Sequence, residues 1–214
     1  TYIATVTASD GTNSTVQNIT VNVTNVNDNT PSITSSATFS ATENQTSIGT
    51  VTATDEDGDT IGFSLSGTDA SSMSINSSSG VLTFNSAPDY ETKLSYSATV
   101  TASDGANSST QDISVTITDI DDVAPVFTSS ATFSAAENQT SIGAVTATDA
   151  DTDDSLIVFS VSGSELLITS GGILTFANAP DYETKTSYSA TVTASDGTNS
   201  ATQDITVNII DAND

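Results

Sequence analysis

The sequence SATFSATENQTSIGTVTATDED at residues 36–57 decides the fold, because it recurs as SATFSAAENQTSIGAVTATDAD at residues 130–151. A second pair follows, in which APDYETKLSYSATVTASDGANSSTQDI at 87–113 returns as APDYETKTSYSATVTASDGTNSATQDI at 179–205. Self-similarity over such a long period indicates a tandem array of one structural unit. The two pairs differ slightly in their spacing, and we expect the length differences to lie in loops.

The first 27 residues match the end of the same unit, with Tyr2 aligned on Tyr96 and Asp10 on Asp104. We therefore expect the C-terminal strands of a truncated repeat at 1–27 and two full repeats at 28–121 and 122–214. Two strands alone cannot bury a core. Their partner strands are thus expected to come from outside this sequence or from a neighbouring chain.

Within each repeat, apolar residues alternate with polar ones, as in Tyr96, Ala98, Val100 and Ala102. Alternation of this kind predicts strands with one buried and one solvated face. Ser and Thr make up about a third of the chain, and Asp-Gly and Ser-Gly turns separate the apolar runs. About seven such runs per repeat predict an all-β fold of tandem seven-stranded Greek-key β-sandwiches joined end to end.

The composition excludes several classes of function. The chain has 2 Lys+Arg against 27 Asp+Glu, a formal net charge of -25, and no His, Cys or Trp. Nucleic acids and anionic membrane surfaces select for basic residues, so neither is an expected partner. No apolar run approaches the length of about 20 residues that a spanning helix needs, so direct membrane insertion is not expected. Without His or Cys, a serine triad and thiol catalysis are impossible, and we expect no enzymatic activity.

The acidic residues gather in five places in each repeat, which in the first repeat are Glu43, Asp55 with Asp57, Asp89 with Glu91, Asp104, and Asp119 with Asp121 and Asp122. Residues two apart on an extended backbone point to the same side. Close carboxylates repel one another by a few kcal/mol per pair at an effective dielectric of about 20. A hard divalent cation with oxygen ligands would neutralise them, and the tolerance of Ca²⁺ for irregular geometry favours it over Mg²⁺.

The order ATEN, ATDxD, DYE, SDG and then NVNDNTP or DIDDVAP resembles the cadherin repeat, with its PEN, DxD, DRE, AxD and DxNDNxP elements. The resemblance covers the whole chain. It implies repeats joined end to end with up to three Ca²⁺ at each complete junction. It also implies that the upstream repeat supplies the PEN glutamate and the DRE acids, while the downstream repeat supplies DxD and the later aspartate.

Carried over to this chain, the resemblance places one complete junction between the two full repeats, with the ligands Glu43, Asp89, Glu91, Asp119, Asp121, Asp122, Asp149, Asp151 and Asp196, and the carbonyls of Ile120 and Val123. The upstream junction would retain Asn25, Asn27, Asp28, Asn29, Asp55, Asp57 and Asp104. The downstream junction would retain Glu137, Asp181, Glu183, Asp211, Asn213 and Asp214. The chain departs from the family pattern at Asn25, where an aspartate is usual, and at Asp121, where an asparagine is usual.

Two other uses of the acids are disfavoured. The stretch Asp55-Glu56-Asp57-Gly58-Asp59 resembles the start of an EF-hand loop, but its twelfth position is Ser66 instead of a bidentate Glu. Asp89 and Glu91 resemble a glycosidase acid pair, but their local spacing, the lack of a Trp platform and a second copy at Asp181 and Glu183 favour a structural ion. Seven N-glycosylation sequons also occur, a number not far above chance in so Ser/Thr-rich a chain.

Together these features predict a calcium-rigidified extracellular repeat module, a stalk or spacer of a large microbial cell-surface adhesin. The expected partners are calcium and neighbouring repeats of the same polypeptide or identical subunits. The alternative is a self-assembling extracellular fibre or matrix subunit that polymerises by β-strand complementation, because an incomplete sandwich invites completion by another chain. A carbohydrate-active or protein-binding domain is disfavoured, because the chain lacks a Trp platform and a unique polar constellation.

Overall fold

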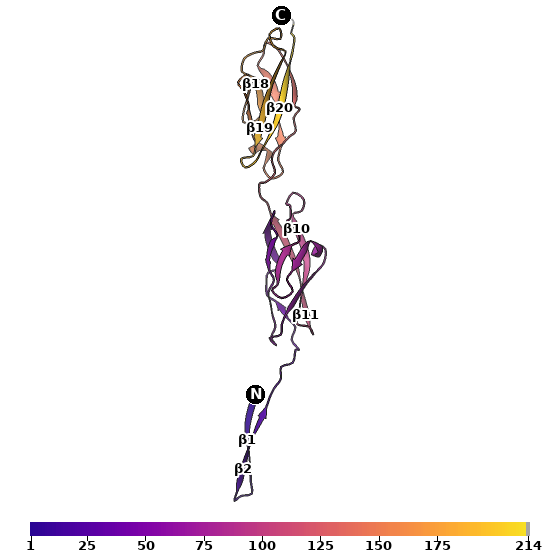
Figure 1. The fold of residues 1–214 in the computed structure, drawn as a ribbon, viewed down its shortest axis with the longest axis vertical. Coiled ribbons are helices and arrows are strands. Elements are labelled where there is room, and N and C mark those ends of the chain that lie inside the picture. Colours follow the sequence, from indigo (N-terminus) through magenta and orange to yellow (C-terminus); the bar gives the residue numbers. More distant parts are fainter. Residues whose placement is uncertain (213–214) are drawn as a thin grey trace. The chain divides into compact units, whose positions relative to one another are not determined.

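The computed structural model describes residues 1–212, which form strands, turns and two three-residue 3₁₀ helices (Figure 1). The predicted all-β fold is confirmed. Two compact units are present, one made of residues 1–89 and 93–117, the other of residues 90–92 and the chain from 118 onward. Among the described residues no helix is long and apolar enough to cross a membrane.

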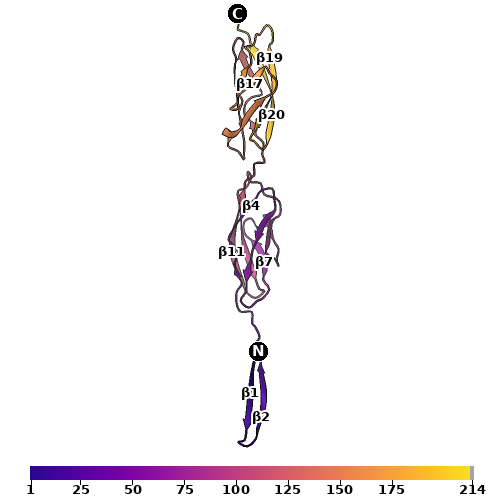
Figure 2. The same cartoon turned by 90° about the vertical axis from the view of Figure 1, so that its left-hand side faces the viewer.

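The chain begins with an antiparallel hairpin of β1 (Tyr2–Ser9) and β2 (Ser14–Val21), visible in indigo in Figure 2. Its turn is Asp10-Gly11, where the positive φ of 91° suits Gly. Every residue of both strands is exposed, including apolar ones such as Tyr2 and Ile19. The hairpin therefore buries no core by itself, as expected for two strands.

The first sandwich packs a four-stranded sheet, in the order β4-β11-β10-β7, against a three-stranded sheet, in the order β5-β9-β8, with the short pair β3-β6 beside them. Its elements are β3 (Ser32–Ile33), β4 (Thr38–Thr42), β5 (Ser47–Thr50), β6 (Ala53–Thr54), β7 (Gly62–Ser66), η1 (Ala70–Ser72), β8 (Met73–Ile75), β9 (Val81–Phe84), β10 (Ser95–Ser103) and β11 (Ser108–Thr118). Two of the seven expected strands are interrupted, so nine segments result.

The second sandwich repeats this arrangement with the orders β13-β20-β19-β16 and β14-β18-β17 and the pair β12-β15. Its elements are β12 (Val126–Phe127), β13 (Thr132–Ala136), β14 (Ser141–Ala144), β15 (Ala147–Thr148), η2 (Asp154–Leu156), β16 (Val158–Val161), β17 (Leu166–Ile168), β18 (Ile173–Phe176), β19 (Ser187–Ser195) and β20 (Ser200–Ile210). The first long strand, β13, pairs in parallel with the last, β20. The length differences between the copies fall outside the strands, around η2 and in the turns beside β17, as predicted.

The alternating pattern places one face of each long strand in the core. Along β10 the buried residues are Ala98, Val100 and Ala102, every second position. The core of the second unit is built from equivalent positions, including Val192 and Ala194 of β19. Removing these apolar side chains from water is the main force that holds the two sheets of each sandwich together.

One turn that occurs in both repeats depends on glycine. Gly80 and Gly172 both have positive φ, and a Cβ on either would lie only 2.1 or 2.2 Å from a carbonyl oxygen, that of Val51 or Val145. The N–H of each of these valines donates to the carbonyl of the same glycine at 2.9 Å. Only a residue without a side chain allows this close approach.

Candidate metal centre

In the first unit, the linker segment before β3 is fastened to the acidic loop that follows β6. Asp57 Oδ2 accepts hydrogen bonds from the backbone N–H of Asp28 at 3.0 Å and of Asn29 at 2.8 Å. The Asn29 side chain donates to Asp57 Oδ1 at 2.9 Å. The N–H and side-chain donors of Asn29 lower the pKa of Asp57, against the opposing effects of burial and of the Asp104 charge.

The second unit repeats this contact with different side chains. Asp151 Oδ2 accepts from the N–H of Asp122 at 2.8 Å and of Val123 at 2.6 Å. Burial raises the pKa of Asp151, but the hydrogen bonds from the N–H of Val123 and Asp122 help to hold the pKa below the usual value. In both units the second Asp of the ATDxD loop therefore organises the linker backbone while remaining ionised.

The first Asp of each ATDxD loop folds that loop and leaves one oxygen free. Asp149 Oδ1 accepts from the N–H of Asp151 and of Thr152, both at 2.9 Å. Asp55 Oδ1 accepts from Asp57 N–H at 2.9 Å. The other oxygen, Oδ2, of both Asp55 and Asp149 is buried and has no hydrogen-bond partner.

Two more carboxylate oxygens of the second unit, Asp151 Oδ1 and Asp196 Oδ2, are likewise buried without a partner. A buried acceptor without a donor loses the hydration energy of the group, and native proteins rarely leave one so. Because these oxygens are anionic, and the unit has Lys185 as its one basic side chain, a cation is the ligand that fits them.

A third loop, between the last two strands of each repeat, also holds the linker. Asp196 Oδ1 accepts from the N–H of Thr198 and Asn199, and Asn199 Nδ2 donates to the carbonyl of Asp121 at 3.2 Å. Thr198 Oγ1 donates to Asp121 Oδ2 at 2.8 Å. The acid predicted at position 121 as a ligand is thus engaged by this loop.

The first unit has the same connection, made by Asn107. Its Nδ2 donates to Asn27 Oδ1 and to the Asn29 carbonyl, both at 3.1 Å. Asp104 Oδ1 accepts from the N–H of Asn107 at 2.6 Å, which is the leading cause of its lowered pKa. Sequence reasoning missed Asn107 and its counterpart in the second repeat, although the repeated ASDGxN segment carried the signal.

Three groups of acids, each within a single unit, bring carboxylate oxygens within 4.8 Å of one another: Asp55 with Asp57 and Asp59, Glu91 with Asp119 and Asp151, and Glu137 with Asp181 and Glu183. Eight of these nine residues were predicted as ligands from the sequence. Asp59 is the addition. Groups of three carboxylates with no Lys or Arg among them are the arrangement that a hard divalent cation stabilises.

The group around Glu137 shows the electrostatic consequence most clearly. Glu137 is buried, and its two oxygens accept from the N–H of Tyr182 and Ala212, each at 2.8 Å. For Glu183, a hydrogen bond from its own backbone lowers the pKa, but burial and the charges of Glu137, Asp211 and Asp181 prevail and raise it. The group therefore favours a bound proton or a bound cation over three free negative charges.

The remaining predicted ligands lie as follows. Glu43 is buried in the first unit, and the carbonyl of Asp89 accepts from Lys93 N–H at 3.0 Å. Asn25 donates through its side chain to the Asp57 carbonyl at 2.7 Å. The side chain of Ile120 is exposed. The predicted ligands Asn213 and Asp214 lie outside the described residues.

Comparisons with known proteins agree with this architecture. The family model described as "Cadherin domain" matches residues 35–118, and "Bacterial Ig domain" matches residues 121–209. Protocadherin Fat 4 of Homo sapiens is 32% identical over 90% of this chain, and Cadherin EGF LAG seven-pass G-type receptor 1 of Mus musculus is 31% identical over 92%. The chain spans only 4% and 7% of the lengths of those two relatives.

Solved structures show the same fold. Repeats EC22-24 of mouse cadherin-23 match with a TM-score of 0.74 and 26% identity, covering 87% of this chain and 68% of that one. Human protocadherin-24 EC1-2 matches with a TM-score of 0.74 and 20% identity, covering 87% of this chain and 99% of that one. The latter likeness is one of fold.

Proposed function

This chain belongs to the cadherin-repeat proteins, and from that premise we propose that it is a calcium-stiffened extracellular spacer in the stalk of a large cell-surface adhesin. In this role the repeats carry no catalytic site. The match of residues 121–209 to a bacterial Ig domain supports a microbial cell surface as the setting. The bound ion, its number at each junction and the setting are parts of the proposal.

One observation carries the proposal: buried, unpartnered carboxylate oxygens occur at the ATDxD and ASDG loops, on Asp55, Asp149, Asp151 and Asp196. Ca²⁺ accepts six to eight oxygen ligands at irregular positions, which fits a donor set of carboxylates, amides and carbonyls in a chain without His or Cys. When bound, the ion supplies the positive charge that makes the acid groups compatible with a folded state.

The residues that would hold calcium are the three acid groups together with the ligands expected from the sequence at the junction, up to three ions per complete junction. The chain's own side chains do the remaining work. Asp57 and Asp151 fix the linker backbone through its N–H groups, and Asn107 and Asn199 hold it from a second loop. Each linker is thereby fixed to the repeat that follows it. A cation shared with acids of the preceding repeat would then restrict the angle between neighbours.

A second candidate function rests on the N-terminal hairpin. The register of β1 with β2, such as Val6 opposite Gln17, repeats that of β10 with β11, where Val100 lies opposite Gln111. Val100 is fully buried, whereas Val6 is 48% exposed. The hairpin thus matches the last two strands of a full sandwich, and its exposed strands are a surface on which a second copy or identical subunit would pair by strand complementation.

Calcium titration tests the main proposal. We expect saturable Ca²⁺ binding by calorimetry, a higher melting temperature in 5 mM Ca²⁺ than in EDTA, and a narrower distribution of dimensions in small-angle scattering. Mg²⁺ at the same concentration is the control for ionic strength. Superimposable melting and scattering curves with calcium and chelator would refute the proposal. Analytical ultracentrifugation over a 100-fold range of protein concentration tests the alternative, which predicts growing oligomers.

A further inference from the structure

The chain has only two basic side chains, Lys93 and Lys185, and they occupy equivalent positions in the two repeats. Each lysine ends the segment DYETK, whose Asp and Glu are candidate calcium ligands. The N–H of Lys93 donates to the Asp89 carbonyl at 3.0 Å, and that of Lys185 to the Asp181 carbonyl at 2.9 Å. Both lysines are therefore part of the turn that presents the acids.

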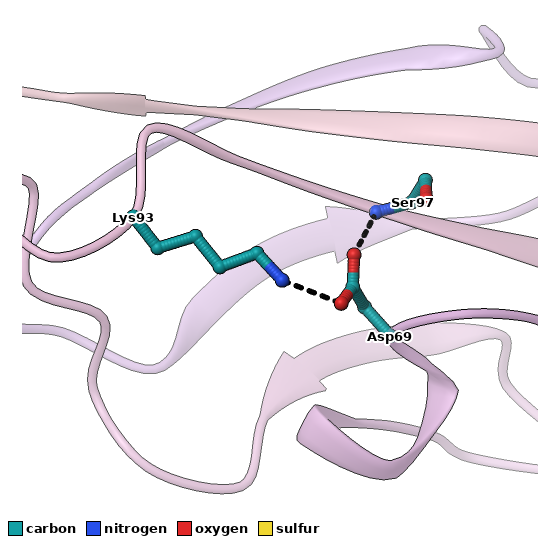
Figure 3. Close-up of polar contacts among 3 residues, drawn as sticks. All are labelled: Asp69, Lys93 and Ser97. Atoms are coloured by element: carbon teal, nitrogen blue, oxygen red, sulfur yellow. Dashed lines mark hydrogen bonds and ion pairs between the residues drawn. The ribbon is translucent and has the colours of Figure 1, made fainter.

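In the first unit the Lys93 side chain is held from two directions. Its Nζ pairs with Asp69, which precedes η1, and lies 4.5 Å from the centre of the Tyr96 ring. The other Asp69 oxygen accepts from Ser97 N–H at 2.9 Å, as Figure 3 shows. The Asp69 side chain is only 14% exposed. The Lys93 hydrogen bond is the leading cause of the lowered pKa of Asp69, followed by Ser97.

The second unit reaches the same arrangement with a different acid. Lys185 Nζ lies 2.7 and 2.8 Å from the two oxygens of Glu165, and 4.3 Å from the centre of the Tyr188 ring. Tyr188 packs edge-on against the buried Phe176 at a centroid distance of 5.1 Å. The acid comes from a loop of different length, yet the lysine, the aromatic ring and the carboxylate meet again. The two repeats thus form the same contact of lysine, carboxylate and aromatic ring, although the acid differs in type and in sequence position.

Each lysine lies two residues after a candidate ligand, so it brings a positive charge close in sequence to the acids. A lysine near a metal site repels the metal, and the Coulomb energy of that repulsion lowers calcium affinity. Loops that carry metal ligands, on the other hand, gain affinity when contacts outside the ligand set fix them in the binding geometry. The acid–lysine–aromatic clamp, defined as Asp69-Lys93-Tyr96 in the first unit and Glu165-Lys185-Tyr188 in the second, supplies such a contact.

We propose that Lys93 and Lys185 are positioning residues that fix the DYETK turns in the geometry that calcium requires. This inference rests on the proposed calcium-binding function. It states that the gain in affinity from fixing the turn exceeds the loss from placing a positive charge near the ion. The clamp therefore belongs to the metal centre although no atom of it is a ligand.

The lysine and the acid of the clamp carry opposite charges. The direction in which each variant changes calcium affinity therefore tests the proposal. K93M and K185M remove a positive charge, whereas D69N and E165Q remove a negative one. A positioning role predicts that all four variants weaken calcium binding, by about 10-fold, measured by calorimetry on the full chain. A purely electrostatic role predicts that the lysine variants bind calcium more tightly and the acid variants more weakly, and that result would overturn the proposal.

Two further measurements separate the clamp from general stability and from the proposed function. K93R and K185R keep the charge and the aromatic contact, and we expect near-native affinity. Melting in EDTA reports structural damage, so a variant that melts lower in EDTA but binds calcium as tightly as the parent chain also overturns the proposal. If the parent chain itself binds no calcium, the proposed function fails, whereas native parent binding with unaffected variants defeats only the clamp.

Discussion

Replacing Asp151 with Asn separates the proposed metal-binding role of this residue from its role in folding the linker. Asn is isosteric with Asp. Its side-chain oxygen still accepts from the N–H of Asp122 and of Val123, whose nitrogens lie 2.8 and 2.6 Å from Asp151 Oδ2 in the parent chain. Hydrogen bonds to a neutral acceptor are weaker than those to a carboxylate, which costs about 1 kcal/mol per bond. Removing one charge from the group with Glu91 and Asp119 offsets part of that loss. Because those two acids are exposed, the relief is about 1 kcal/mol.

In EDTA the substitution D151N should therefore change the free energy of unfolding by no more than about 1 kcal/mol. In calcium the parent chain gains RT ln(1 + [Ca²⁺]/Kd) per ion, which is about 2.7 kcal/mol when the concentration is 100 times Kd. The variant loses this gain at the affected site. The destabilisation should thus be about 2.7 kcal/mol larger in calcium than in EDTA.

Urea unfolding of both chains, with and without calcium, measures the four free energies that this comparison needs. D57N, the equivalent change in the first unit, provides a matched variant at a loop with the same linker contacts. An equal destabilisation by D151N in calcium and in EDTA would refute the reasoning, because it would assign Asp151 a purely structural role.

N199A should expose the linker amides to hydrogen exchange by removing the side-chain donor to that segment, and protection factors equal to those of the parent chain would contradict the contact. Acid should destabilise the second unit through Asp151, because a folded-state pKa below the usual 3.8 gives stability that is present above the unfolded pKa and lost as pH falls through the folded value. E183Q should do the reverse in EDTA at neutral pH, raising the melting temperature while weakening calcium binding, because the raised pKa of Glu183 marks a destabilising charge. G172A should cost more than about 1 kcal/mol through its positive φ and close carbonyl, whereas G171A, which has open space around it, serves as its control in the same melting assay.

Much of the fold could be predicted because the repeat and its period-two alternation are local properties of the sequence. The buried positions of β10, Ala98, Val100 and Ala102, follow directly from alternation. The interruption of the first two strands in each repeat could not be read this way. Residues 51–52 are a single break between β5 and β6, set by the approach of Gly80 to the Val51 carbonyl, a contact between distant parts of the chain.

In the candidate site, too, local features could be predicted from the sequence, whereas contacts between distant residues could not. Pairs such as Asp149 and Asp151 are two residues apart, so the sequence alone indicates that their side chains share a side. The contact of Asn199 with Asp121 joins residues 78 apart, and nothing in local periodicity predicts it. The same holds for Glu165 and Lys185, whose pairing depends on a loop that differs in length between the repeats. The candidate ligands could therefore be proposed from the sequence, whereas the contacts that hold these side chains in place depend on the tertiary fold.

The contacts that hold the linker should also affect calcium affinity. The linker hydrogen bonds to Asp57 and Asp151 are donated by backbone N–H groups of the linker itself. The unpartnered oxygens lie on the same or neighbouring side chains. Because hydrogen bonds of the repeat itself hold its linker, an ion that binds there has less conformational entropy to overcome. Weakening the linker contacts should consequently reduce calcium affinity even where every carboxylate is retained, which N199A tests when its calcium titration is compared with that of the parent chain.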